Sequence, residues 1–156
     1  MENFEIASFE EIREEFLQRV TQVIWCNVAT IDTQGRPRSR ILHPVWEGHI
    51  GWVATRRNTL KSKHLDHTHY VSLAYITDVA KPVYADCEVT WIDDLAEKTR
   101  IWNFIKDTPE PVGYDPTPIF GSVENENLGV LKLTPWRIEV ADFPIHRHIW
   151  HVNKEL

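Results

Sequence analysis

Two short segments carry the residues whose types and spacing could do chemistry. Arg38 and Arg40 occupy alternate positions of a predicted strand, so both side chains point to the same face of the sheet. Thr55 ends the next predicted strand, and Thr59 and Lys61 open a predicted helix. Guanidinium groups, hydroxyls, an ammonium group and a helix N-terminus are the donors that bind a phosphate monoester. The spacing therefore predicts a site for a phosphorylated small molecule.

The distribution of charge along the chain is consistent with an anion site in this region. The 156 residues carry 17 lysines and arginines against 23 aspartates and glutamates, and this net charge of −6 argues against general nucleic-acid binding. Residues 33–65 hold seven basic residues and one acidic residue, which is a net charge of +6 and leaves −12 for the rest. The seven are Arg36, Arg38, Arg40, Arg56, Arg57, Lys61 and Lys63. A solvated, arginine-rich strand face has the same charges, so charge alone leaves both interpretations open.

The elements that must position these residues follow from the apolar periodicity. Ser8 and Glu11 have the spacing of a capping box, and apolar residues recur at helical intervals over 9–20. Further helices are predicted over 58–68 and from Asp93-Asp94 to Phe104. Segments with alternating or β-branched residues predict six strands, over 23–31, 38–46, 49–55, 70–77, 83–92 and 130–140.

The last of these strands changes phase along its length. Leu131 belongs to the apolar set before Pro135, whereas Trp136 and Ile138 belong to the apolar set after it. A slip of one residue is what a β-bulge produces, and proline is tolerated at a bulge. The pattern predicts a bulge at this point.

Six strands with mostly local connections and few helices predict a mainly β protein, a small antiparallel barrel with peripheral helices. The proline-rich segment 106–118 is predicted to be an ordered loop. Because no repeat, low-complexity tract or linker divides the sequence, we expect residues 1–156 to form a single domain.

Several observations bear on where the protein resides. The first residues include no basic region followed by an apolar one, so no secretory signal is expected. No stretch approaches 18 apolar residues, so no membrane span is expected. Two cysteines, Cys26 and Cys87, are too few for a disulfide framework and lie in predicted strand centres, where we expect inert thiols. These features predict a cytoplasmic protein.

The ordered set of motifs resembles the pyridoxamine 5′-phosphate oxidase-like family, the FMN-binding split β-barrels. Arg40-Ile41-Leu42 looks like the strand that lies along the isoalloxazine ring in that family. Thr55 is similar to the hydroxyl residue that ends a following strand, and Thr59-Leu60-Lys61 to the turn that holds the phosphate. The resemblance extends from about Phe9 to Val140 with the motifs in the same order. It implies a six-stranded antiparallel split β-barrel with Greek-key-like connections.

The resemblance also assigns three residues outside those motifs. Arg38 is expected to add to the phosphate cluster. Trp136 lies in a segment similar to the family's C-terminal strand, whose aromatic residue borders the flavin. His43 follows the Arg40-Ile41-Leu42 strand directly, so it lies either near the flavin ring or in the core or edge of the sheet.

The function that the resemblance implies is that of an FMN-dependent oxidoreductase acting on an unidentified small molecule, as a homodimer with FMN at the subunit interface. The flavin would supply the chemistry, so no catalytic side chain is assigned. Segment 143–151 matches the substrate element of pyridoxamine phosphate oxidases only loosely, so the likeness is to the short general flavin- or deazaflavin-binding members. Two alternatives stay open: a flavin-binding or storage module without turnover, and the same fold with a deazaflavin coenzyme.

Histidines gather in two places without the pattern of a metal site. His64 and His67 share one face of a predicted helix, and His146 and His148 alternate as in a strand. Neither pair has a further ligand at metal-binding spacing. We therefore expect structural or solvent-exposed histidines and no metal.

Overall fold

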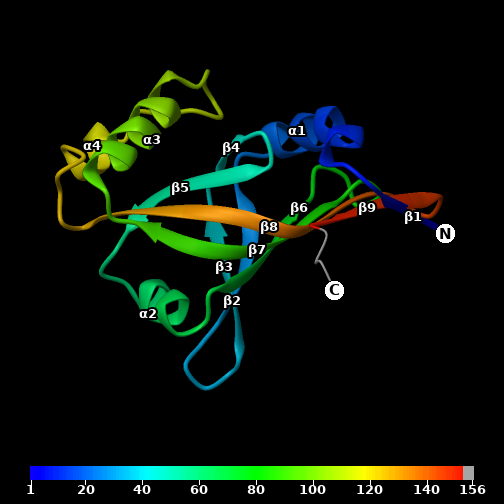
Figure 1. Cartoon of the computed structure of the whole chain (residues 1–156), viewed down its shortest axis with the longest axis horizontal. Coiled ribbons are helices and arrows are strands. Elements are labelled where there is room, and N and C mark those ends of the chain that lie inside the picture. Colours follow the sequence, from blue (N-terminus) through cyan, green and yellow to red (C-terminus); the bar gives the residue numbers. More distant parts are fainter. Residues whose placement is uncertain (153–156) are drawn as a thin grey trace.

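The computed structural model describes residues 1–152, drawn in Figure 1. The strands are β1 (Glu2–Ile6), β2 (Cys26–Ile31), β3 (Pro37–Leu42), β4 (Val45–Glu47), β5 (Ile50–Arg56), β6 (Tyr70–Tyr75), β7 (Val83–Ile92), β8 (Leu128–Asp142) and β9 (His146–His151). The helices are a 3-10 turn at Phe9–Glu11, α1 (Arg13–Gln22), α2 (Leu60–His67), α3 (Leu95–Asp107) and α4 (Thr117–Phe120). The protein is thus mainly β with peripheral helices, as the sequence predicts.

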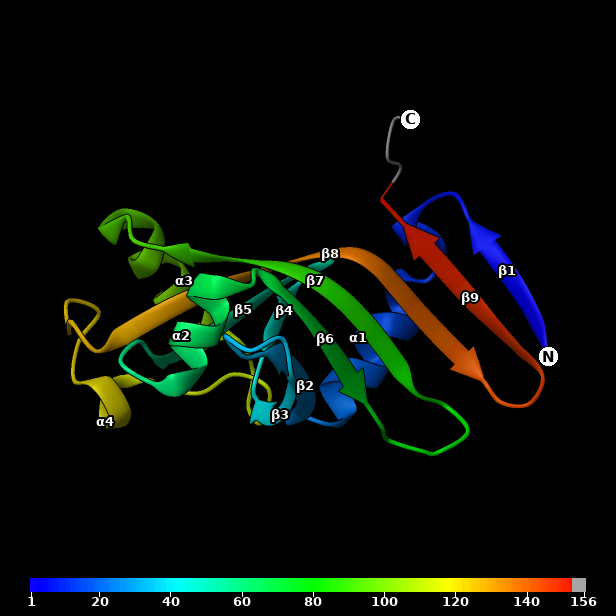
Figure 2. The same cartoon turned by 90° about the horizontal axis from the view of Figure 1, so that it is seen from below.

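The strands form one sheet that curls into a split barrel. Hydrogen bonding runs in the order β3-β2-β6-β7-β8, and β8 also pairs with β5, which in turn pairs with β4. The chain passes directly from β3 to β4 through His43-Pro44, where the strand predicted over 38–46 is divided because proline has no N–H for the ladder. Beyond the barrel, the end of β8 pairs with β9 as an antiparallel hairpin, and β1 pairs with the other edge of β9 as a parallel strand. Figure 2 shows these strands extending from the barrel.

The bulge predicted near Pro135 is present. Asp86 on β7 faces Arg137, and the next residue, Cys87, faces Pro135, so Trp136 is the extra residue. Trp136 is 41% exposed, while Leu133, Pro135 and Ile138 are buried. The prediction that Trp136 shares the apolar face with Ile138 is therefore wrong, because the phase changes at Trp136 itself and turns its ring outward.

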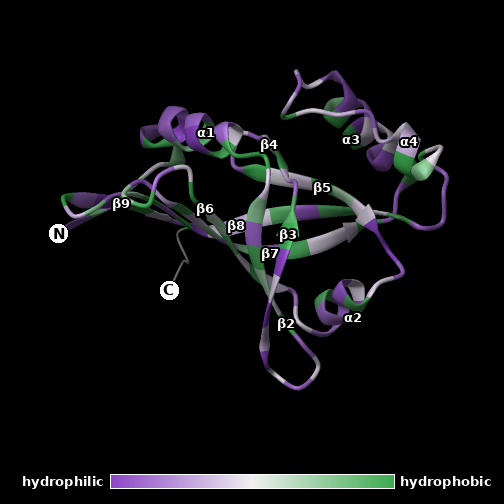
Figure 3. Cartoon of the chain, turned by 180° about the vertical axis from the view of Figure 1, so that it is seen from behind, coloured by the Kyte–Doolittle hydropathy of each residue, from purple (hydrophilic) through white to green (hydrophobic). Residues whose placement is uncertain are grey.

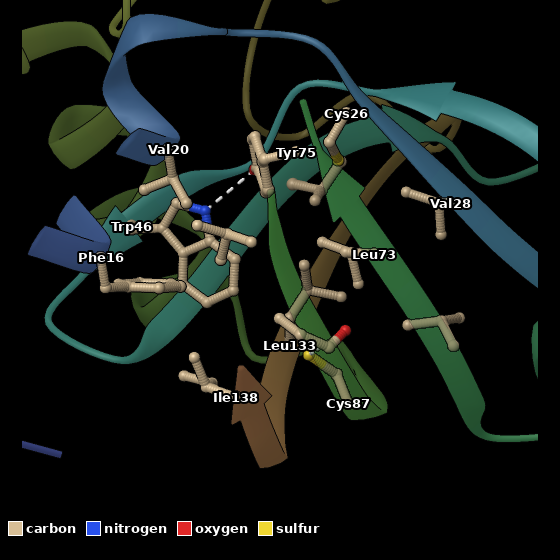
Figure 4. Packing of buried hydrophobic residues seen from close by; sticks show 14 of the residues in the cluster. Phe16, Val20, Cys26, Val28, Trp46, Leu73, Tyr75, Cys87, Leu133 and Ile138 are labelled. Atoms are coloured by element: carbon tan, nitrogen blue, oxygen red, sulfur yellow. Dashed lines mark hydrogen bonds between the residues drawn. The ribbon is translucent and has the colours of Figure 1, made fainter. Parts of the chain in front are cut away.

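The main core fills the barrel and the space under α1. The predicted capping box at Ser8 is present, and α1 carries hydrophilic and hydrophobic faces in Figure 3. Its Phe16 ring packs edge-on against Trp46 at 5.0 Å, and Trp46 Nε1 donates a 2.9 Å hydrogen bond to Tyr75 (Figure 4). Both cysteine thiols are buried here, and burial raises the pKa of Cys26 to about 12, which fits the inert thiols that we predict.

A second, smaller core holds α3 and α4 over β4 and β5. Ile101 and Ile105 of α3 and Phe120 of α4 are buried against strand residues that include Val130. Because α3 runs to Asp107 and α4 begins at Thr117, the loop predicted over 106–118 is shortened to 108–116. This packing brings the loop to the same hollow that the first turn of α2 lines. None of the helices in residues 1–152 has the length and hydropathy to cross a bilayer.

Candidate functional site

A hollow of about 610 Å³ opens between β3, β5, the start of α2 and the α3–α4 segment. Thr55, Thr59 and Lys61 line its polar end. A smaller hollow of about 340 Å³ adjoins it and brings in Arg40 and Leu60. The two hollows share Ile41, Leu42, Thr59 and Lys61, so they form one continuous surface, which we call the β3–α2 site.

The start of α2 presents a hydroxyl and an ammonium group to the site. Thr59 is the N-cap, and its side chain accepts a hydrogen bond from the Ser62 N–H. The Lys61 ammonium donates a hydrogen bond to the Thr55 hydroxyl at the end of β5. Burial, with a smaller contribution from the Arg40 charge, lowers the pKa of Lys61 from 10.5 to about 8. The ammonium thus lies where its charge is unfavourable in the absence of an anion.

Arg40 brings a second positive charge to the same place. Its Nε donates to the Thr30 hydroxyl at 3.2 Å, and its Nη2 lies 2.9 Å from Nδ1 of His64. Within residues 1–152, neither Arg40 nor Lys61 has a carboxylate at ion-pair distance, although many of the other arginines do. Two partly buried cations at a helix N-terminus, without acidic partners, make a site for an anion.

The other end of the site is aromatic and apolar. Ile41 is 62% exposed, and its side chain lines the site. The centre of the His43 ring lies 4.8 Å from that of Tyr114 and 5.1 Å from that of Trp25, with the ring planes tilted to each other. Its Nε2 lies 2.7 Å from the carbonyl oxygen of Val112, so Nε2 carries the proton, and Nδ1 is the acceptor of the neutral ring. Burial lowers the pKa of His43 and raises that of Tyr114 to about 12, which keeps both rings neutral.

Eight of the ten residues predicted from the sequence line the β3–α2 site: Arg40, Ile41, Leu42, His43, Thr55, Thr59, Leu60 and Lys61. Arg38 does not, because its guanidinium turns toward Asp32, 3.9 Å away at the β2–β3 hairpin. Trp136 lies instead at a separate hollow of about 460 Å³, which we call the outer hollow, on the face of β6 and β7 beside Tyr70 and Asp86.

Three residues that cover the aromatic end are not predicted from the sequence. Trp25 precedes β2, and Pro111 and Tyr114 belong to the loop after α3. The four prolines of 106–118 mark an ordered loop but give no sign of which part of the barrel it lies against. Its position follows from tertiary contacts, such as the hydrogen bond from the Tyr114 N–H to the Ile105 carbonyl.

Comparisons with known proteins identify the fold. No protein-family model matches the sequence, and no curated protein matches it. A NimC/NimA family protein from Clostridium acetobutylicum superposes with a TM-score of 0.73 at 14% identity, over 92% of this chain and 94% of the other. A protein from the same organism related to general stress protein 26, of the pyridoxinephosphate oxidase family, gives 0.72 at 14% identity, over 92% and 96%.

A pyridoxamine 5′-phosphate oxidase-related, FMN-binding protein from Nostoc punctiforme gives a TM-score of 0.69 at 15% identity, over 96% of this chain and 94% of the other. The three likenesses agree with the resemblance drawn from the motifs. They show that this chain has the split β-barrel fold of the pyridoxamine 5′-phosphate oxidase-like proteins.

Proposed function

We propose that the protein binds FMN at the β3–α2 site and is an FMN-dependent oxidoreductase acting on a small molecule. The observation that carries the proposal is the pair of cations, Arg40 and Lys61, without carboxylate partners in residues 1–152 and adjoining a flat apolar surface. A phosphate monoester on a planar aromatic group has this division between a dianionic end and an apolar end. The phosphate of FMN fits the cationic end of the site, and its ring system fits the apolar end.

Each residue has a distinct role in this proposal. Arg40 and Lys61 bind the phosphate as charged donors, and Thr55 and Thr59 add hydroxyls beside the N-terminus of α2. Ile41 and Leu42 lie along the ring, while Tyr114 and the loop after α3 exclude water from it. When bound, FMN supplies hydride or electron exchange at its N5 atom.

A second copy of the chain would complete the site. The outer hollow carries Tyr70 and Trp136, which are 56% and 41% exposed on one face of the sheet. Large exposed aromatic side chains on one face are typical of protein–protein contacts. We propose that this face forms a homodimer in which Trp136 of one subunit borders the flavin held by the other. Beyond this second copy and the small-molecule substrate, no partner is proposed, neither nucleic acid nor membrane.

A binding or storage module without turnover is the second candidate. The observation that favours it is that segment 143–151 matches the substrate element of pyridoxamine phosphate oxidases only loosely. A deazaflavin coenzyme is a variant of either candidate, since its phosphate would use the same cations. A cytoplasmic location stays a prediction from the sequence.

The test compares FMN with riboflavin, which lacks the phosphate. We expect FMN to bind at least tenfold more tightly, because each charge-assisted hydrogen bond contributes about 1.5–3 kcal/mol. Arg40→Gln should remove most of that preference, whereas Lys63→Gln, an exposed lysine of the same helix, should keep it. Equal affinity for the two flavins would contradict the phosphate site.

Oxidation of a nicotinamide donor by the FMN-loaded protein separates the two candidates. Turnover supports the oxidoreductase, and tight binding without turnover of any donor supports the storage module. A bound coenzyme that absorbs at a shorter wavelength than FMN would identify the deazaflavin variant.

A further inference from the structure

His64 is a buried histidine directly beneath the phosphate end of the β3–α2 site. It lies one turn after the start of α2, on the side of the helix that packs against β2, and is 2% exposed. Its neighbour Thr30 on β2 is 1% exposed. A buried polar side chain must be hydrogen-bonded, so its partners define its role.

The partners of His64 are the groups that hold Arg40. Nδ1 lies 2.9 Å from Nη2 of Arg40 and 3.2 Å from the Thr30 hydroxyl oxygen. Because a guanidinium can only donate, Nδ1 must accept, and the ring proton is on Nε2. The Thr30 oxygen in turn accepts the 3.2 Å hydrogen bond from Arg40 Nε. Two of the five guanidinium N–H groups are thus occupied by Thr30 and His64, and within residues 1–152 the others have no protein acceptor and remain for a ligand.

We propose that His64, together with Thr30, is a positioning residue that holds the Arg40 guanidinium toward the bound phosphate, and that it can do so only while its imidazole is neutral. This rests on the proposed function, since it assigns the support of the phosphate-binding arginine. A proton on Nδ1 would remove the acceptor and place two cations within 2.9 Å of each other. Protonation of His64 therefore releases Arg40 and weakens phosphate binding.

The charged groups around His64 are arranged to keep it neutral. Arg40 and Arg38 act on it from β3, and Asp32 acts from the end of the β2 strand. Burial is the main cause that lowers the pKa of His64, the two arginines lower it further, and Asp32 opposes them. Asp32 is itself engaged by the Arg36 side chain and by two backbone N–H groups.

The consequence is an unusually steep loss of FMN affinity in acid. A phosphate monoester gains one proton near pH 6, which by itself gives at most a tenfold loss per pH unit. If His64 must also be neutral, two protons oppose binding, and the loss approaches a hundredfold per pH unit below the pKa of His64. His64→Asn cannot be protonated, and its amide oxygen can take the acceptor position of Nδ1.

The experiment measures the FMN dissociation constant from pH 4.5 to 7.5 in the wild-type protein and three variants. His64→Leu, which has no acceptor, should weaken FMN binding about tenfold at pH 7.5. For His64→Asn, the FMN dissociation constant at pH 7.5 should stay within about threefold of the wild-type value. In acid its affinity should fall at most tenfold per pH unit, because only the phosphate can still take up a proton. His67→Leu, at an exposed histidine of the same helix, is the control and should match the wild type.

A double-mutant comparison separates positioning from a general effect on folding. In an Arg40→Gln background, His64→Leu should cause no further loss of FMN affinity, because the group that it positions is already gone. Nitrogen-15 NMR of the unliganded protein gives a readout that needs no flavin: Nδ1 of His64 should be unprotonated, and Arg40→Gln should raise the pKa of His64.

The outcomes distinguish this proposal from the proposed function. If the wild-type protein binds no FMN, the proposed function is refuted and the role of His64 falls with it. If the wild type binds FMN but His64→Leu has the same affinity and the same acid limb, only the role of His64 is overturned. An NMR result with the proton on Nδ1 at pH 7 would also overturn it.

Discussion

Replacement of Lys61 by methionine should stabilise the unliganded protein while it weakens FMN binding. The Lys61 ammonium is held partly buried near Arg40, and its pKa falls from 10.5 in the unfolded chain to about 8 in the folded protein. The charged form of Lys61 is therefore less favourable in the folded protein than in the unfolded chain, and this difference lowers the free energy of unfolding. Methionine fills the same space with no charge, so it removes this cost.

The size of the effect follows from the two pKa values. A difference of this size corresponds to roughly 3 kcal/mol, at about 1.4 kcal/mol for each pKa unit. Solvent screening of a side chain that is only partly buried reduces the expected gain to about 1–2 kcal/mol. For a protein of 156 residues, this is a rise in melting temperature of roughly 2–8 °C.

The gain in stability should depend on pH. Below pH 8, Lys61 is charged in both states and the full cost is present, so Lys61→Met should be more stable than the wild type. As the pH rises from 8 to 10.5, the folded wild-type protein loses its proton first, and the difference should shrink to zero.

Urea unfolding of the unliganded protein at pH 7 and pH 10 is the assay, with FMN affinity at pH 7 measured in parallel. The FMN dissociation constant of Lys61→Met should rise at least tenfold, because a charged donor to the phosphate is lost. Lys63→Met, at an exposed position of the same helix, should change neither quantity. The unfavourable charge of buried Lys61 would be contradicted if Lys61→Met were less stable than the wild type at pH 7. It would also be contradicted if the two proteins had equal stability at pH 7 and at pH 10.

Three other expectations follow from the site and its supports. FMN affinity of the wild-type protein should fall up to tenfold per pH unit above about pH 8 as Lys61 loses its proton, and a titration of Lys61→Met should show no such alkaline limb. Tyr114→Ala should weaken FMN and riboflavin by the same factor of roughly three to ten, since the residue lies at the aromatic end; a loss confined to FMN would contradict its placement. Gly113→Ala should destabilise the protein by about 1–3 kcal/mol in thermal unfolding, because the added Cβ would lie 1.9 Å from the Thr108 carbonyl oxygen, and an unchanged melting temperature would contradict the described loop.

The sequence predicts the β3–α2 site best where local rules decide the geometry. Strand alternation fixes the side on which Arg40 lies, and the Thr59 cap fixes where α2 begins. That Arg40 and Lys61 meet also depends on the packing of α2 against β2, which spacing does not contain. The predicted strand over 38–46 is divided at His43-Pro44 into β3 and β4, and Arg40 still lies on a strand.

Other features depend on contacts between residues distant in the sequence. The strand pattern predicts that Arg38 and Arg40 share a face, but it contains no sign that Asp32 engages Arg38 at the hairpin. Trp136 is the residue that the bulge inserts, and a phase change in the sequence does not say which of two neighbouring residues is extra. Its position in a predicted helix does not distinguish His64 from an exposed histidine. Only its burial and its contact with Thr30 show its role.

The visible absorption spectrum of the wild-type protein, recorded after mixing with excess FMN and gel filtration, tests the central claim most directly. We expect a retained flavin spectrum at about one FMN per chain, and its loss in the Lys61→Met variant. A colourless wild-type protein that retains no FMN would contradict the assignment of the β3–α2 site to this cofactor.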